Sequence, residues 1–129
     1  MATGFPATTG DVLTAAAFNG LVAFTVGAAQ TDNYTAVAAD QYQVLVSMNK
    51  ATAVDFKIPT NASVAFPVGT AITVLNIGVG DCTISAVTSG TTTILSAGAV
   101  AASPVLGQYK TAVCIKTATD AWYVVGGIA

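Results

Sequence analysis

Few side chains in this sequence could carry out acid–base or nucleophilic chemistry. Its 129 residues include six aspartates, four lysines and two cysteines, but no histidine, glutamate or arginine. A serine or cysteine nucleophile would have no imidazole to activate it. A hydrolase would need paired aspartates, and Asp32, Asp40, Asp81 and Asp120 stand in predicted turns. We therefore predict a protein that is not an enzyme, with no catalytic residues and no cofactor.

The two cysteines are predicted to be free thiols. Cys82 shares a predicted strand face with Ile84, whereas Cys114 shares its face with Lys110 and Lys116. If these are an inner and an outer face, the two Cβ atoms point apart and cannot be bridged. We expect Cys82 to be buried and Cys114 to lie nearer a surface or interface. Zinc usually takes four Cys or His ligands, so no metal site is predicted.

The low charge of the sequence indicates a surface that another protein covers. Charged residues make up 8% of the chain, the net charge is −2 and the mean hydropathy is +0.70, whereas ordinary domains are about 25% charged. Four scattered lysines cannot form a phosphate-binding stripe, so nucleic acid is not an expected partner. Polar residues interrupt Val12–Ala29, and no basic residue precedes Lys50, so neither a membrane span nor a signal peptide is expected. The remaining partner is protein, in a homo-oligomer or a larger assembly.

Alternating apolar and polar residues predict an all-β fold, a small antiparallel sandwich or roll around a β-meander core. In Ala53–Ile58 the apolar side chains alternate with Asp55 and Lys57, the period of a half-buried strand. Ala71–Leu75 is apolar on both faces, which indicates a strand covered on both sides. Further extended segments are expected at Leu21–Gly27, Tyr34–Ala38, Tyr42–Met48, Ser63–Phe66, Cys82–Val87, Thr91–Leu95, Tyr109–Thr117 and Ala121–Val125.

The N-terminal residues 1–33 are predicted to form an extended arm, followed by a β-domain at 34–129. The arm holds the one helix candidate, near residues 14–20, with Thr14 as N-cap and Gly20 after its end. The segment Val12–Val26 could dock on a partner or could join the core, and the sequence does not separate these two interpretations. If it docks, the expected assembly contacts are its large apolar side chains and those nearby: Phe5, Val12, Leu13, Phe18, Leu21 and Phe24.

Several segments in order resemble a module found in structural proteins of tailed-bacteriophage virions. They are a strand ending in Ile58-Pro59, the turn and strand of Asn61–Thr70, and the apolar strand with its glycine-rich turn in Ala71–Gly80. The run Gly107–Lys116 and the closing strand Asp120–Gly127 complete the resemblance, which covers roughly Asp40 to the C-terminus.

This resemblance implies a virion structural protein, because the module occurs in head decoration (cement) proteins and in tail fibre or appendage proteins. The chain holds the module and a short arm without shaft repeats, which favours a decoration protein. Such a protein is expected on the outer surface of the capsid, bound to the major capsid protein. It is expected to assemble as a trimer that stabilises the joints between capsomers. The alternative is a tail protein involved in attachment to the host surface.

Overall fold

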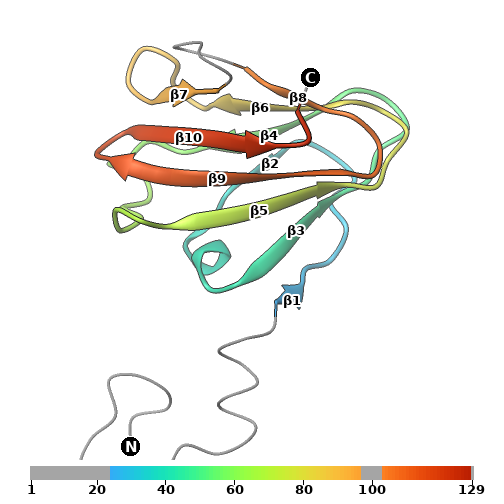
Figure 1. Cartoon of the computed structure of the whole chain (residues 1–129), viewed down its shortest axis with the longest axis horizontal. Helices are drawn as coiled ribbons and strands as arrows, with labels where there is room; N and C mark the ends of the chain where they lie inside the picture. Colours follow the sequence, from blue (N-terminus) through green and yellow to red (C-terminus); the bar gives the residue numbers. More distant parts are fainter. Residues whose placement is uncertain (1–23, 97–102, 129) are drawn as a thin grey trace, which may run out of the picture.

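The computed structural model describes residues 24–96 and 103–128, and nearly all of its regular structure is β (Figure 1). The extended segments predicted from the sequence overlap the observed strands, except that Ser63–Phe66 contains no strand. The sequence pattern did not predict β8 or the short 3₁₀ helix η1. The elements are β1 (Thr25–Val26), β2 (Tyr34–Thr35), η1 (Ala38–Gln41), β3 (Val44–Met48), β4 (Val54–Ile58), β5 (Ala71–Asn76), β6 (Cys82–Ala86), β7 (Thr93–Leu95), β8 (Val105–Leu106), β9 (Lys110–Ala118) and β10 (Ala121–Gly126).

The strands form two mixed sheets, and successive strands alternate between them from β1 to β9. One sheet has six strands in the order β1-β3-β5-β9-β10-β7, and the other has four in the order β2-β4-β6-β8. Because each connection crosses between sheets, strands that neighbour within a sheet mostly run parallel, as in the β1-β3-β5 and β2-β4-β6 series. Only β9 and β10 are joined as an antiparallel hairpin in the six-stranded sheet.

The prediction of an antiparallel fold with a meander core was therefore wrong. Of the eight strand pairings in the described residues, five are parallel and three are antiparallel. The turns after β3 and after β5, which resemble hairpin turns in sequence, instead join strands of different sheets. Alternation reports which face of a strand is buried, but it does not report which strand lies beside it.

The inward side chains of both sheets form one apolar cluster. Phe66, from the connection after β4, packs edge-on against Trp122 of β10 with ring centroids 5.6 Å apart. Trp122 is 1% exposed, so it is a core residue. The buried apolar side chains are Ala36, Val46, Met48, Val54, Phe56, Ile58, Phe66, Ile72, Val74, Cys82, Ile84, Ile94, Leu106, Ala112, Cys114, Trp122 and Val124.

The two faces of β9 are reversed relative to the prediction. Cys114 and Lys116 lie on the buried side of the strand, while Val113 and Ile115 lie on the outer, half-buried side. The alternation has the predicted period of two, but its phase is opposite because a lysine occupies an inward position. The helix expected near residues 14–20 lies outside the described residues.

Candidate interaction surface

The outward side chains of the six-stranded sheet form an uncharged surface. The strand register aligns five of them across the sheet: Val26 beside Leu45, Leu45 beside Thr73, Thr73 beside Val113, and Val113 beside Val125. None of these residues is buried, and Val26 and Val125 are 70% and 48% exposed. We call this surface the outer sheet face, made up of Val26, Leu45, Ala71, Thr73, Leu75, Thr111, Val113, Ile115, Tyr123, Val125 and Leu95.

A second cross-strand row widens the outer sheet face. Ala71 of β5 lies beside Ile115 of β9, which lies beside Tyr123 of β10, and Tyr123 pairs with Leu95 of β7. Tyr123 is 45% exposed. Two parallel rows of apolar and threonine side chains, with no charge among them, form a contiguous apolar patch of the kind that marks protein–protein contact sites.

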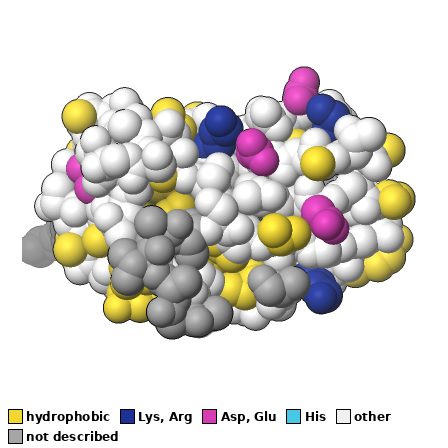
Figure 2. Space-filling model, turned by 90° about the horizontal axis from the view of Figure 1, so that it is seen from above, with side chains coloured by type: hydrophobic (Ala, Val, Ile, Leu, Met, Phe, Trp, Pro, Cys, Tyr) yellow, Lys and Arg dark blue, Asp and Glu magenta, His cyan; other side chains and the backbone are white. Residues whose placement is uncertain are grey.

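The outer face of the four-stranded sheet carries charged side chains, unlike the outer sheet face. Its register sets Thr35 beside Lys57 and Lys57 beside Ser85, and it sets Asp55 beside Thr83. This face is polar and carries both signs of charge, as expected for a sheet face in contact with water. Figure 2 shows a side of the molecule on which Lys and Asp side chains of both signs lie near one another among uncharged ones. The uncharged outer sheet face is therefore the better candidate for a partner.

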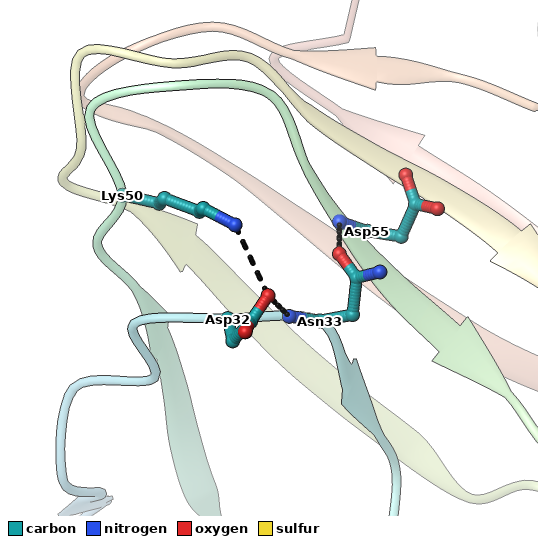
Figure 3. Close-up of polar contacts among 4 residues, drawn as sticks. All are labelled: Asp32, Asn33, Lys50 and Asp55. Carbon is teal, nitrogen blue, oxygen red and sulfur yellow. Dashed lines mark hydrogen bonds and ion pairs between the residues drawn. The ribbon is translucent and has the colours of Figure 1, made fainter.

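Polar contacts hold the segment after β1 against the β-domain (Figure 3). Lys50 Nζ lies 3.0 Å from Asp32 Oδ1, which also accepts a bond of 2.9 Å from the backbone N–H of Asn33. Asn33 Oδ1 in turn accepts a bond from the backbone N–H of Asp55. The Asn33 N–H and then the Lys50 ammonium hold the pKa of the Asp32 carboxyl below its usual value. Asp32 and Asn33, which the sequence assigned to the arm, are thus bonded to the connection between β3 and β4 and to β4 itself.

The predicted assembly residues fall mostly outside the part of the chain that the structure describes. Phe24 is the exception: it is 58% exposed and stands two positions before Val26 of the outer sheet face. The contacts of the other five residues stay a prediction. They are Phe5, Val12, Leu13, Phe18 and Leu21.

Sequence reasoning did not find the outer sheet face as a site. The useful signal was in Ala71–Leu75, whose apolar residues on both faces predicted cover on both sides. One face of β5 packs in the core, and the other, with Thr73 and Leu75, is half-buried on the outer sheet face. The equivalent residues Val113 and Ile115 were missed because Cys114, which lies on the opposite side of the strand, was expected nearer the surface.

Both cysteines are free and fully buried. This confirms the prediction for Cys82 and corrects it for Cys114, which lies in the core because the inward face of β9 was misassigned. Burial raises the pKa of the Cys82 thiol to about 11 and that of the Cys114 thiol to about 12. Buried neutral thiols of this kind act as small apolar side chains rather than nucleophiles.

We expect both thiols to resist a thiol reagent at pH 8 until the protein unfolds. Because the folded-state pKa values are raised, the thiols add stability that is fully present below the unfolded value near 8.5 and is lost as pH rises through 11 to 12. Urea unfolding at pH 7 and pH 10 measures this loss. The loss of unfolding free energy between pH 7 and pH 10 should be smaller in a Cys82→Ala/Cys114→Ala variant than in the wild type. An equal loss in both proteins would contradict the prediction.

Two further acidic side chains, Asp40 and Asp120, have hydrogen-bond partners within the fold. Asp40, which the sequence placed in a turn, is buried in η1 and accepts bonds from the Tyr34 hydroxyl and the Val37 N–H at 2.8 and 2.9 Å. Burial, and then the bond to Asp40, raise the pKa of Tyr34 above its ordinary value. Within residues 24–96 and 103–128, no group of three or more His, Cys, Asp or Glu side chains could hold a metal ion.

Comparison with known proteins gives no relative from which a role could be carried over. No family model, no curated protein and no solved structure matches the chain. Among the described residues, no helix combines the length and the apolar character needed to cross a membrane.

Proposed function

We propose that this protein is a structural assembly protein, a two-layer β-sandwich that docks on protein through its outer sheet face. The observation that carries the proposal is the uncharged register row from Val26 to Val125, set against the charged outer face of the other sheet. A face of this composition gains free energy when it is removed from water, at roughly 25 cal/mol per Å² of apolar surface.

The size of this face indicates that a second contact is needed. Six strands about 4.8 Å apart, each about five residues long, give a face of roughly 400 Å². A stable interface buries roughly 800 Å² on each partner. Residues 1–23, which precede β1 in the sequence and contain Asp11 as their one charged side chain, would supply the difference. We therefore propose that the arm and the outer sheet face bind together.

The resemblance of residues 58–80 and 107–127 to the tailed-phage module supports a more specific assignment. We propose a capsid decoration protein, assembled as a trimer on the outer surface of the head and bound to the major capsid protein. Each copy would add buried apolar interface at the joints between capsomers, which stabilises the shell against the pressure of packaged DNA.

The experiment that tests this assignment is the copy number per purified virion, measured by quantitative mass spectrometry against the major capsid protein. A large stoichiometric fraction of the capsid subunits is the result expected for a decoration protein. A handful of copies would overturn that assignment and move the protein to the tail or to a unique vertex.

Deletion of residues 1–23 should leave a folded β-domain that binds capsids far more weakly. The cut preserves β1, whose Thr25 N–H donates to the Gln43 carbonyl, and it preserves the contacts of Asp32 and Asn33. Circular dichroism checks the fold and co-sedimentation with capsids measures binding. Full retention of binding would contradict a role for the arm.

The second candidate is a tail appendage protein that binds a host-surface glycan. Exposed tyrosines favour it, because rings of this kind stack on sugars: Tyr109 is 75% exposed and Tyr42 is 71% exposed. The copy-number measurement separates the two candidates, since an appendage is present in few copies. A glycan array would then identify the ligand, and replacement of Tyr109 by Ala should remove its binding.

A further inference from the structure

Lys116 is a buried lysine at the inward face of β9. It is 2% exposed and lies directly across from Trp122 of β10, which is 1% exposed. A lysine is almost never buried to this extent unless a partner group requires it. The burial of Lys116 therefore indicates a specific role for its amine.

The amine of Lys116 contacts neutral oxygen atoms. Its Nζ donates to Asn61 Oδ1 at 2.5 Å and to the backbone carbonyl of Phe66 at 2.6 Å. In the described part of the chain the one ion pair joins Lys50 to Asp32, so no carboxylate lies within 4.0 Å of Lys116. Burying a charged amine without an ion-pair partner is costly, so this arrangement favours chemistry that removes the charge.

A carboxylate lies beside the same asparagine. Asp120 Oδ1 accepts a bond of 2.7 Å from the backbone N–H of Asn61 and one of 3.1 Å from the Thr92 hydroxyl. Trp122, which lies across from Lys116, packs edge-on against the Phe66 ring. Asn61 thus contacts the Lys116 amine through its side chain and the Asp120 carboxylate through its backbone, although Asn61 and Lys116 are 55 residues apart in sequence.

We propose that Lys116 and Asn61 join in an autocatalytic isopeptide bond. The neutral amine attacks Asn61 Cγ, so that a bond forms from Nζ to Cγ while the bond from Cγ to Nδ2 breaks. The proton that Nζ loses ends on Nδ2, which leaves as ammonia, and Asp120 relays this proton through a bridging water because its carboxylate lies more than 4.0 Å from Nζ. The reaction needs no oxidant and no cofactor, because an amide replaces an amide.

The distances suit this reaction. Since a carbonyl bond is about 1.2 Å long, a contact of 2.5 Å from Nζ to Oδ1 puts Nζ within about 3.7 Å of Cγ. Reacting atoms about 3 to 3.5 Å apart are in near-attack geometry. The product would tie the connection between β4 and β5 to β9, and so link the two sheets covalently whatever partner the protein binds.

Mass spectrometry of the intact, denatured chain tests the proposal. We expect the wild-type mass to be lower than the sequence mass by one molecule of ammonia. Trypsin should leave fragments 58–110 and 111–129 joined and should fail to cut after Lys116. Lys116→Arg should restore the full mass, and the matched variant Lys110→Arg, at an exposed position of the same strand, should keep the ammonia loss. A wild-type chain of unmodified mass after prolonged incubation would overturn the proposal.

Asp120→Asn tests the proton transfer separately from the fold. Asp120 has a positive φ of 54°, which asparagine tolerates well, and an amide oxygen can accept the same two hydrogen bonds. We expect this variant to fold but to form the bond much more slowly, with a melting temperature lower by on the order of 10 °C because a long loop is left open. An unchanged rate of ammonia loss would overturn the role of Asp120.

Discussion

Replacement of Val125 by Lys should abolish assembly through the outer sheet face while leaving the domain folded. Val125 is 48% exposed at the end of the register row, so a lysine there is solvated in the free protein. In the assembled state its ammonium would be buried among apolar side chains without a partner, at a cost of roughly 3 kcal/mol or more. That cost corresponds to a loss of about a hundredfold in affinity.

Val87→Lys is the matched control for this prediction. Val87 has the same exposed fraction of 48% but lies after β6, away from the outer sheet face. Sedimentation velocity over a range of concentrations measures self-association, and co-sedimentation with capsids measures docking. Both variants should melt near the wild-type temperature, and only Val125→Lys should lose assembly. Equal assembly by the two variants would rule out this face as the docking surface.

Gly80→Ala should destabilise the fold more than any surface change. A Cβ atom at Gly80 would lie 1.9 Å from the Thr52 carbonyl oxygen and 2.2 Å from its carbonyl carbon. Both are backbone atoms of the connection between β3 and β4, which the Gly80 N–H also contacts by donating to the Lys50 carbonyl at 2.9 Å. Because backbone cannot move aside as a side chain can, we expect a loss of about 3 kcal/mol or more and a melting temperature roughly 10 °C lower.

Gly90→Ala provides the control for this substitution. A Cβ atom at Gly90 would have no neighbour within 4 Å, so the change should be neutral or should stabilise by a few tenths of a kcal/mol through the unfolded state. Thermal unfolding of the two variants measures the difference. Similar melting temperatures would show that the loops after β3 and β5 can separate without cost.

The close approach at Gly80 belongs to a packed end of the molecule where several connections meet. The side-chain amide of Asn76 donates to the carbonyls of Gly80 and Leu106 at 2.9 and 2.8 Å, and its oxygen accepts from the Gly78 N–H. Asn76 is fully buried. One side chain therefore joins the end of β5, the glycine-rich turn and β8, which explains why a turn that resembles a hairpin in sequence instead crosses between sheets.

Local pattern was sufficient to predict where most strands lie. Alternation in Ala53–Ile58 and Ala121–Val125 matches β4 and β10, because the side-chain period of a strand is set by local geometry. The low charge was also evident from the sequence alone, and with it the expectation of a protein partner. Apolar residues on both sides of Ala71–Leu75 indicated a strand with two covered faces.

The tertiary structure decided which strands pair, which side of β9 is buried and which distant residues come together. Whether two strands run parallel depends on the path of the connection between them, and no single strand carries that information. The inward phase of β9 depends on Asn61 and the Phe66 carbonyl, which accept the Lys116 amine from far along the chain. The sequence by itself therefore determined most of the strands, and the protein partner that its low charge favours stays a prediction. Only the folded chain brought together the outer sheet face and the Lys116, Asn61 and Asp120 cluster, because both consist of residues distant in sequence.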